Sequence, residues 1–320
     1  MAVVRRWLAT FTIGNMATVT YSQPNLGFNR TLLHLIAEDG MKALLKNILL
    51  FSRLYRSPRP LIDDHHRTVI SWSAKAACTR VLIWHYERLG LIDEALQYHH
   101  WPHKYRMNVL YKSRRYVEGR KKLIREGPPL WDYVKVVRDP VKRCVSSYRH
   151  ALAHGYADKN MSAVLGKKID HKYGFSYATF LEYLKGINIS RCDVHHQLQA
   201  HPLDKIKFGR TWLVHIDEYD LDTELASIDS AQGVMLNRKD SVAGDFVRKD
   251  AHRYAIGKRK SDSFDVDQWL RPLRKSDTAS WPKQALEKAP EAREIVGKLY
   301  GHDYRTISEL KNRSERFEAD

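Results

Sequence analysis

Hydrophobic and polar positions follow a helical period in the first part of the chain. From Thr31 to Arg56, apolar residues recur at helical spacing with a break at Gly40, and the proline-marked stretch SPRPLIDD follows. This pattern predicts a helical N-terminal extension over residues 1–61. The opening stretch RRWLATFTIGNMATVTY has two arginines before an apolar run, as a secretory signal does. Polar residues interrupt the run, so we do not expect a cleaved signal.

After the extension, the pattern changes to short runs of β-branched and aromatic residues. Four such runs predict strands: RTVISW, RMNVLY, DYVKVVRD and RTWLVHIDEY. Helical stretches separate them, among them RVLIWHYERLG, which ends at a glycine. Strands that alternate with helices are typical of an α/β fold with a parallel sheet covered on both faces. We expect the catalytic domain over residues 62–310 and a polar tail over residues 311–320.

The stretch SWSAKAACTR, residues 71–80, joins the first of these strands to the following helix. Lys75 stands there in a turn of small residues, which would let backbone N–H groups and the helix N-terminus approach an anion. Thr79 could add a hydroxyl. The alternative is a tight connection with a surface lysine. The turn contains no glycine and so is not the nucleotide-binding loop G-x-x-x-x-G-K-[ST].

The stretch VKVVRDPVKRCVSSYRHAL, residues 134–152, repeats the order of strand, turn and helix. Arg138 ends the strand, and Pro140 suits the first turn of the helix. Ser146 lies about two helical turns further on, within reach of an anion that Arg138 also holds. The alternative is a capping Asp139 beside a structural arginine.

Together the two stretches resemble the sulfotransferases that use 3′-phosphoadenosine 5′-phosphosulfate (PAPS), in particular the carbohydrate branch, sulfotransferase family 2. The first family motif reads approximately P-K-x-[AG]-[CS]-T, which AKAACT matches with Ala74 in place of the proline. The second reads R-[DE]-P-x-x-R-x-x-S-x-[YF], and RDPVKRCVSSY matches every fixed position. The resemblance implies a P-loop-like parallel β-sheet flanked by helices. It also implies cofactor-binding residues, namely Lys75, Ala76, Ala77, Cys78, Thr79 and Arg80 for the 5′-phosphosulfate, and Arg138 and Ser146 for the 3′-phosphate.

Further along, DVHHQLQ is similar to the family's D-x-H-W-x-P-Q. It retains Asp193, His195 and Gln199, with His196 and Leu198 where Trp and Pro are usual. HIDEYDLD and LYGHDYRTI are similar to later family elements, so the resemblance covers about residues 66–310. On a helix, Gln199 would share a face with His195.

Sulfuryl transfer needs cations that face the leaving phosphate and a base that takes the proton of the acceptor hydroxyl. Lys75 is the candidate for the first role. His195 is the candidate base, with His103 in YHHWPHKY as the alternative and His196 left open. The resemblance implies a carbohydrate or glycolipid acceptor, which the sequence does not identify. The scheme requires no metal.

Charge and cysteine content leave several partners open. The chain has 54 Lys and Arg against 37 Asp and Glu, a formal net charge of +17, which favours a polyanionic cofactor, an anionic membrane or nucleic acid. Its three cysteines form no CxxC pair, which fits a reducing compartment. We expect a cytoplasmic enzyme that does not bind nucleic acid, with peripheral membrane association left open. The alternatives are a nucleic-acid-binding protein with basic patches such as GRKKLIRE, and a Mg²⁺-dependent P-loop kinase, which the missing glycines disfavour.

Overall fold

The structure is a computed structural model that describes residues 45, 47–236, 266–274 and 283–315. The chain divides into two compact units, Met1–Asn47 and Ile48–Asp320. Every feature below lies in the second unit. Most of the predicted N-terminal extension lies outside the described residues, although residues 48–54 are helical.

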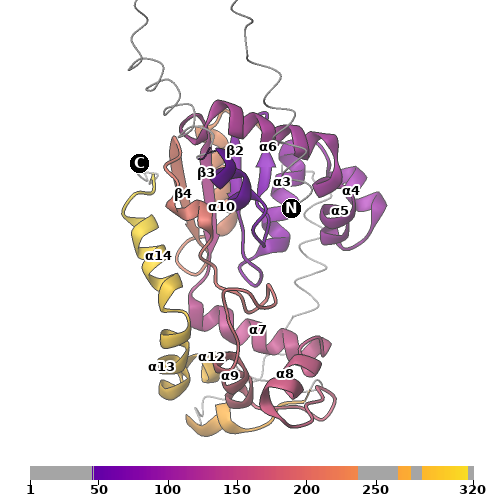
Figure 1. The fold of residues 1–320 in the computed structure, drawn as a ribbon, viewed down its shortest axis with the longest axis vertical. Helices are drawn as coiled ribbons and strands as arrows, with labels where there is room; N and C mark the ends of the chain where they lie inside the picture. The colour runs from indigo at the N-terminus through magenta and orange to yellow at the C-terminus, as the bar shows by residue number, and fades with distance from the viewer. Residues whose placement is uncertain (1–44, 46, 237–265, 275–282, 316–320) are drawn as a thin grey trace, which may run out of the picture. The chain divides into compact units, whose positions relative to one another are not determined.

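A four-stranded sheet forms the centre of this unit (Figure 1). Its strands are β1 (Leu61–Asp63), β2 (Thr68–Ser71), β3 (Asp132–Val137) and β4 (Arg210–His215), in the order β1-β2-β3-β4. β1 pairs with β2 antiparallel, whereas β2, β3 and β4 are parallel. The α/β class with a mostly parallel sheet is therefore confirmed, as are the strands in RTVISW, DYVKVVRD and RTWLVHIDEY. The three-residue β1 is too short to show a pattern.

The strand predicted for RMNVLY is wrong. The segment instead completes helix α5 (Pro102–Asn108) and continues into a 3₁₀-helix, Leu110–Lys112. Pro102 occupies the first turn, where its fixed φ favours a helix. Arg106 is buried with its guanidinium carbon 4.1 Å from the centre of the Trp72 ring, so it packs inward. An alternating pattern would instead have placed this arginine in solvent.

Local sequence signals set many helix ends. Ser113, Asp139, Ser176 and Asp220 each accept a hydrogen bond from a first-turn N–H as N-caps. The other described helices are α3 (Cys78–Leu89), α4 (Ile92–Tyr98), α6 (Arg114–Glu126), α7 (Pro140–His154), α8 (Asp158–Leu165), α9 (Tyr177–Lys185), α10 (Leu221–Ala231), α12 (Lys283–Lys288), α13 (Pro290–Leu299) and α14 (Gly301–Lys311). Three further 3₁₀-helices are Pro128–Leu130, Pro202–Lys205 and Val266–Leu270.

Alternate strand residues bury the two faces of the sheet against different helices. Ile70 and Val134 belong to a core that includes α3 and α10. Their neighbours Val69 and Tyr133 belong to a second core with α6 and residues 50 and 54. Because strand side chains alternate between faces, this division is what a sheet covered on both sides requires.

A third core joins α7, α8, α9, α12 and α13, which Figure 1 shows grouped together below the sheet. β3 leads directly into α7, so the carboxyl ends of the parallel strands face this helical group. In open α/β sheets, this edge is where ligands bind. Among the described helices, none combines the length and apolar character that crossing a membrane requires.

Candidate functional site

The turn between β2 and α3 holds two non-glycine residues in the left-handed region. Lys75 has φ 68° and Ala77 has φ 52°. Ala77 is the N-cap of the 12-residue helix α3, and no side chain caps that end. First-turn N–H groups are therefore available to an anion, and the helix dipole would favour one there. Backbone strain of this kind is concentrated at functional sites.

Arg138 brings the second candidate motif to this turn. It directly follows β3, the parallel neighbour of β2, and its Nη1 donates to the carbonyl oxygen of Lys75 at 3.3 Å. Its Nε lies 3.6 Å from Asp217 Oδ1. Asp139 caps α7 by accepting from the N–H of Lys142 at 2.9 Å, so the capping role of this aspartate is confirmed. Asp139 therefore caps the helix while the neighbouring Arg138 contacts the lysine turn.

The last residue of the DVHHQLQ segment, Gln199, forms hydrogen bonds with the backbone of Arg138 on both sides. Gln199 accepts from the Arg138 N–H at 2.9 Å and donates to its carbonyl oxygen at 2.8 Å. The Gln199 and Ala200 N–H groups in turn donate to the buried Asp303 at 3.0 and 2.9 Å. Residues 191–200 form turns and not a helix, so Gln199 lies against Arg138 and shares no helix face with His195.

Arg143, the second arginine of the R-D-P motif, ties three segments together. It is buried on α7, and its Nε donates to the carbonyl oxygen of Ala74 at 2.9 Å. Its Nη2 lies 3.4 Å from the carbonyl oxygen of Val194. Arg143 therefore fixes the lysine turn and the DVHHQLQ segment to one helix. Arg143 is a fixed position of the motif, but its role as a link between these segments depends on contacts that the sequence does not show.

The sequence did not single out two cations, Arg149 on α7 and Lys283 on α12. Burial lowers the pKa of Lys283 on α12, and the charges of Arg149 and Arg138 lower it further. Both arginine charges thus act on Lys283, and an anion beside it would relieve this repulsion. Ser146 is half-buried on α7, one helical turn before Arg149. Lys283 lies far along the chain in a region without a motif.

His103 lies directly against α3. Its Nε2 is 3.1 Å from Thr79 Oγ1 and 3.9 Å from Cys78 Sγ. Burial lowers its pKa to about 3, and the charges of Arg106, His195 and Lys75 act in the same direction. The ring is therefore neutral near pH 7 in this structure.

His195 forms a dyad with Asp193. The Nδ1 atom lies 2.7 Å from Asp193 Oδ1, and the His195 N–H donates to the same oxygen at 2.9 Å. Burial opposes ionisation of Asp193, but these hydrogen bonds outweigh it and lower the pKa of the carboxyl to about 2. An ionised Asp193 holds the proton on Nδ1, which leaves Nε2 as the basic nitrogen.

His150 on α7 is a further member of this cluster that the sequence analysis missed. Its ring centroid is 4.5 Å from that of His195, and Tyr156 lies 4.9 Å from His195. Burial lowers the pKa of His150 to about 2, and Lys75 is the next largest cause. The charge of Lys75 lowers the pKa of both His103 and His150, so it acts on two of these histidines. His150 lies one helical turn after Ser146. This spacing could have indicated from the sequence that His150 faces the same side of α7.

The other predicted cofactor-binding residues have different surroundings. Ala76 is buried, whereas Ala77, Cys78 and Thr79 are half-buried. Arg80 pairs with Asp222 of α10 at 2.6 Å and lies 3.8 Å from Glu87. Its charge is thus already balanced by carboxylates. His196 is buried and bonded to Ser147 Oγ at 2.9 Å, so its ring faces α7 and the helical core.

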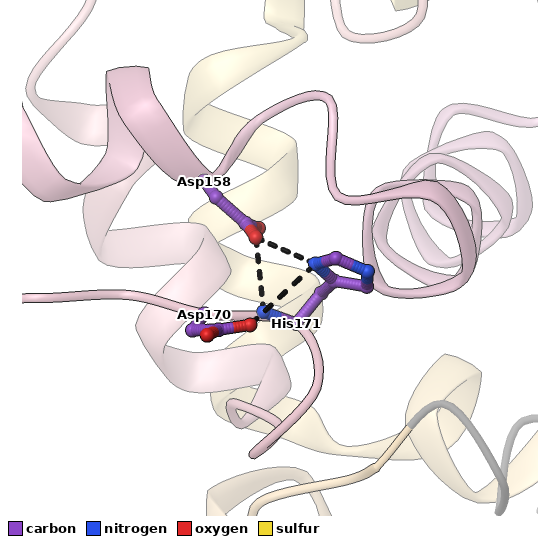
Figure 2. A group of neighbouring side chains, drawn as sticks. All are labelled: Asp158, Asp170 and His171. Carbon is purple, nitrogen blue, oxygen red and sulfur yellow. Dashed lines mark hydrogen bonds and ion pairs between the residues drawn. The ribbon is translucent and has the colours of Figure 1, made fainter.

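A separate group of three side chains, Asp158, Asp170 and His171, converges near the end of α7 (Figure 2). His171 Nδ1 lies 2.6 Å from Asp158 Oδ2 and 3.7 Å from Asp170 Oδ1. The His171 N–H also donates to Asp158, at 3.0 Å. These bonds close the loop after α8.

Comparison with known proteins provides no relative: no family model, curated protein or solved structure matches the chain.

Proposed function

We propose that this protein is a PAPS-dependent sulfotransferase that transfers a sulfuryl group to a hydroxyl of a carbohydrate or glycolipid. The observation that carries the proposal is the contact between its two candidate anion-binding motifs. Arg138 Nη1 lies 3.3 Å from the carbonyl oxygen of Lys75, although the two residues are 63 positions apart. PAPS carries its 5′-phosphosulfate and 3′-phosphate on one nucleoside, so two neighbouring anion sites fit this donor.

The 5′-phosphosulfate is assigned to the P-loop-like turn after β2. The N–H groups at the start of α3, where no side chain provides a cap, would contact its oxygens. Lys75 supplies the positive charge. Left-handed φ angles at Lys75 and Ala77 give this turn its curvature without glycine.

The 3′-phosphate is assigned to Arg138 and Ser146. The cluster with Arg149 and Lys283 supports the assignment, because burial and the two arginines lower the pKa of Lys283 and an anion would offset that repulsion. A dianionic phosphate there distinguishes PAPS from simpler adenylates.

The acceptor hydroxyl is assigned to the space near His195. In the transfer, the acceptor oxygen forms a bond to sulfur and the bond from sulfur to the bridging phosphate oxygen breaks. His195 Nε2 takes the hydroxyl proton, and Lys75 faces the charge left on the 5′-phosphate. The bond to Asp193, at 2.7 Å, orients the ring and stabilises the imidazolium that forms.

The decisive experiment is thermal unfolding with the desulfated donor, 3′-phosphoadenosine 5′-phosphate (PAP). At 100 times its dissociation constant, PAP should stabilise the fold by about 2.7 kcal/mol. Lys75→Ala should lower turnover with PAPS far more than it lowers PAP affinity, because its interaction strengthens in the transition state. Lys298→Ala, at an exposed position paired with Glu294, is the control. Salt-steep binding to DNA or RNA without PAP affinity, or Mg²⁺-dependent use of ATP, would instead support the nucleic-acid or kinase alternative.

A further inference from the structure

A cavity of about 280 Å³ lies beside α14, and none of the residues assigned to the donor or to the base lines it. Its walls come from three stretches of chain: residues 53–57, residues 190–205 and one face of α14. His302, Thr306 and Glu309 contribute the α14 wall, at the spacing of a single helix face. The cavity is near the lower end of the volumes that hold small-molecule ligands, about 300–1,000 Å³.

Cations outnumber unpaired acids in this cavity. Arg53, Arg56 and Lys205 line it, and none of the three forms an ion pair with a carboxylate of the described residues. Asp204 also lines it, but this buried carboxylate already accepts from the His201 N–H at 2.6 Å and lies 3.3 Å from Lys135 Nζ. The exposed Glu309 is the remaining acid. The charge of the cavity therefore favours an anion.

The hydrogen-bonding groups also fit an anion. His201 Nδ1 accepts from the Leu203 N–H at 3.2 Å, so its proton is on Nε2. Nε2 lies 3.4 Å from the carbonyl oxygen of Arg56, whose Nη2 donates to Ser190 at 2.7 Å. The Nη2 atom of Arg56 is thus fixed by a hydrogen bond to the backbone that lines the cavity. The other guanidinium N–H groups of Arg56 and the hydroxyls of Ser57 and Thr306 can donate to the several oxygens of one tetrahedral anion.

We propose that this cavity is a second ligand site that binds a small phosphomonoester, with the phosphate held by Arg53, Arg56 and Lys205. A phosphate dianion matches the excess of positive charge, and the rest of the volume accommodates the organic group that carries it. The site is distinct from the proposed donor site. Gln199 faces Arg138, whereas its neighbours Leu198 and Ala200 line the cavity.

The test is isothermal titration of the full chain with glucose 6-phosphate, with glucose as the uncharged control. We expect binding of the phosphate ester alone, and a dissociation constant raised about tenfold or more in Lys205→Ala, since a charge-assisted contact is lost. Arg53→Ala should have a similar effect. Lys205 is exposed, so its removal leaves the fold intact even if Arg53→Ala does not.

Arg138→Ala separates the two sites. In this variant the dissociation constant for glucose 6-phosphate should stay within about twofold of the value for the unmodified chain, whereas PAP should bind more weakly. The proposal is overturned if the ester does not bind, if glucose binds equally well, or if Arg138→Ala abolishes binding that Lys205→Ala leaves unchanged. The last result would place the phosphate in the donor site.

Discussion

Arg138 donates from Nη1 to the carbonyl oxygen of Lys75 at 3.3 Å, and this bond joins the ends of two parallel strands. Its backbone is fixed separately, by Gln199 on both the N–H and the carbonyl oxygen. The guanidinium can therefore be removed while the turn that carries it stays in place.

Arg138→Ala should lose discrimination between PAP and adenosine 5′-monophosphate, which lacks the 3′-phosphate. The ratio of their dissociation constants should fall about tenfold or more, because a charge-assisted hydrogen bond contributes about 1.5–3 kcal/mol. Titration calorimetry measures both constants. Lys142→Ala is the matched control, since this half-exposed lysine lies 3.3 Å from the same Asp217. An unchanged ratio in Arg138→Ala would show that the arginine is only structural.

A substitution of Gly155, at the end of α7, tests how closely the loop around His171 packs against this helix end. Its φ is +67°, and a Cβ built there would lie 2.3 Å from His171 Nδ1. Gly90 ends α3 with φ +66° but has open space around it. Gly90→Ala should therefore cost only the left-handed strain, about 1–2 kcal/mol. Gly155→Ala should cost about 2–3 kcal/mol more, because His171 must move and lose its bond to Asp158.

Urea unfolding measures both losses. Combining Gly155→Ala with His171→Ala should remove the steric part, since the two changes concern the same contact. Equal losses in the two glycine variants would mean that the His171 ring moves away without cost.

The sequence predicted the parts of the fold and site that depend on local signals. The strand-to-helix turns at Lys75 and Arg138 follow from short β-branched runs, and Pro140 and Gly90 mark helix ends. Asp193, which bonds His195, stands only two residues before it. Each of these features is encoded within a few residues.

The contacts that assemble the site are long-range and could not be predicted in this way. Asp303 holds Gln199 from 104 positions away, and Arg143 reaches Ala74 across 69. The charge of Arg138 lowers the pKa of Lys283, which belongs to the distant helix α12. The wrong strand in RMNVLY has the same origin, since the buried Arg106 packs over the ring of Trp72, which lies 34 positions earlier in the chain.

His85 on α3 predicts how stability depends on pH. It is fully buried, and neither ring nitrogen has a hydrogen-bond partner among the described residues. Burial lowers its pKa to about 3; the charge of Asp63 raises the pKa by a smaller amount, and the charge of Arg88 lowers it further. The unfolded chain thus takes up a proton at a higher pH than the folded protein does. The stability contributed by the neutral ring is present above about pH 6.5 and is lost as pH falls toward 3.

His85→Leu should remove this loss, which amounts to about 5 kcal/mol over the whole window. The free energy of unfolding, measured with urea from pH 7.5 to pH 4, should therefore fall less steeply in His85→Leu than in the unmodified chain. His65→Leu, at an exposed position, should keep the original slope. A His85→Leu slope equal to that of the unmodified chain would show that the ring does not resist protonation.

His195 and His103 are the two predicted bases, and their surroundings differ in a way that kinetics can resolve. Nδ1 of His195 lies 2.7 Å from an ionised Asp193, an arrangement that favours an imidazolium once Nε2 has taken a proton. His103 has Nε2 3.1 Å from Thr79 Oγ1, and burial together with Arg106, His195 and Lys75 lowers its pKa to about 3. A ring that resists protonation this strongly is a poor general base near pH 7.

His195→Ala should therefore bind PAP normally and lose about 100-fold or more in kcat, the lower range for general-base removal. Asp193→Asn should lose a smaller factor, because the imidazolium keeps a neutral partner in place of a charged one. His103→Ala should lose at most about tenfold, through disturbed packing against Thr79. Steady-state rates with PAPS and a carbohydrate acceptor, alongside PAP titrations, measure each effect. If His103→Ala instead loses the rate and His195→Ala keeps it, the base lies ahead of β3, and the proton must leave through the ring beside Thr79.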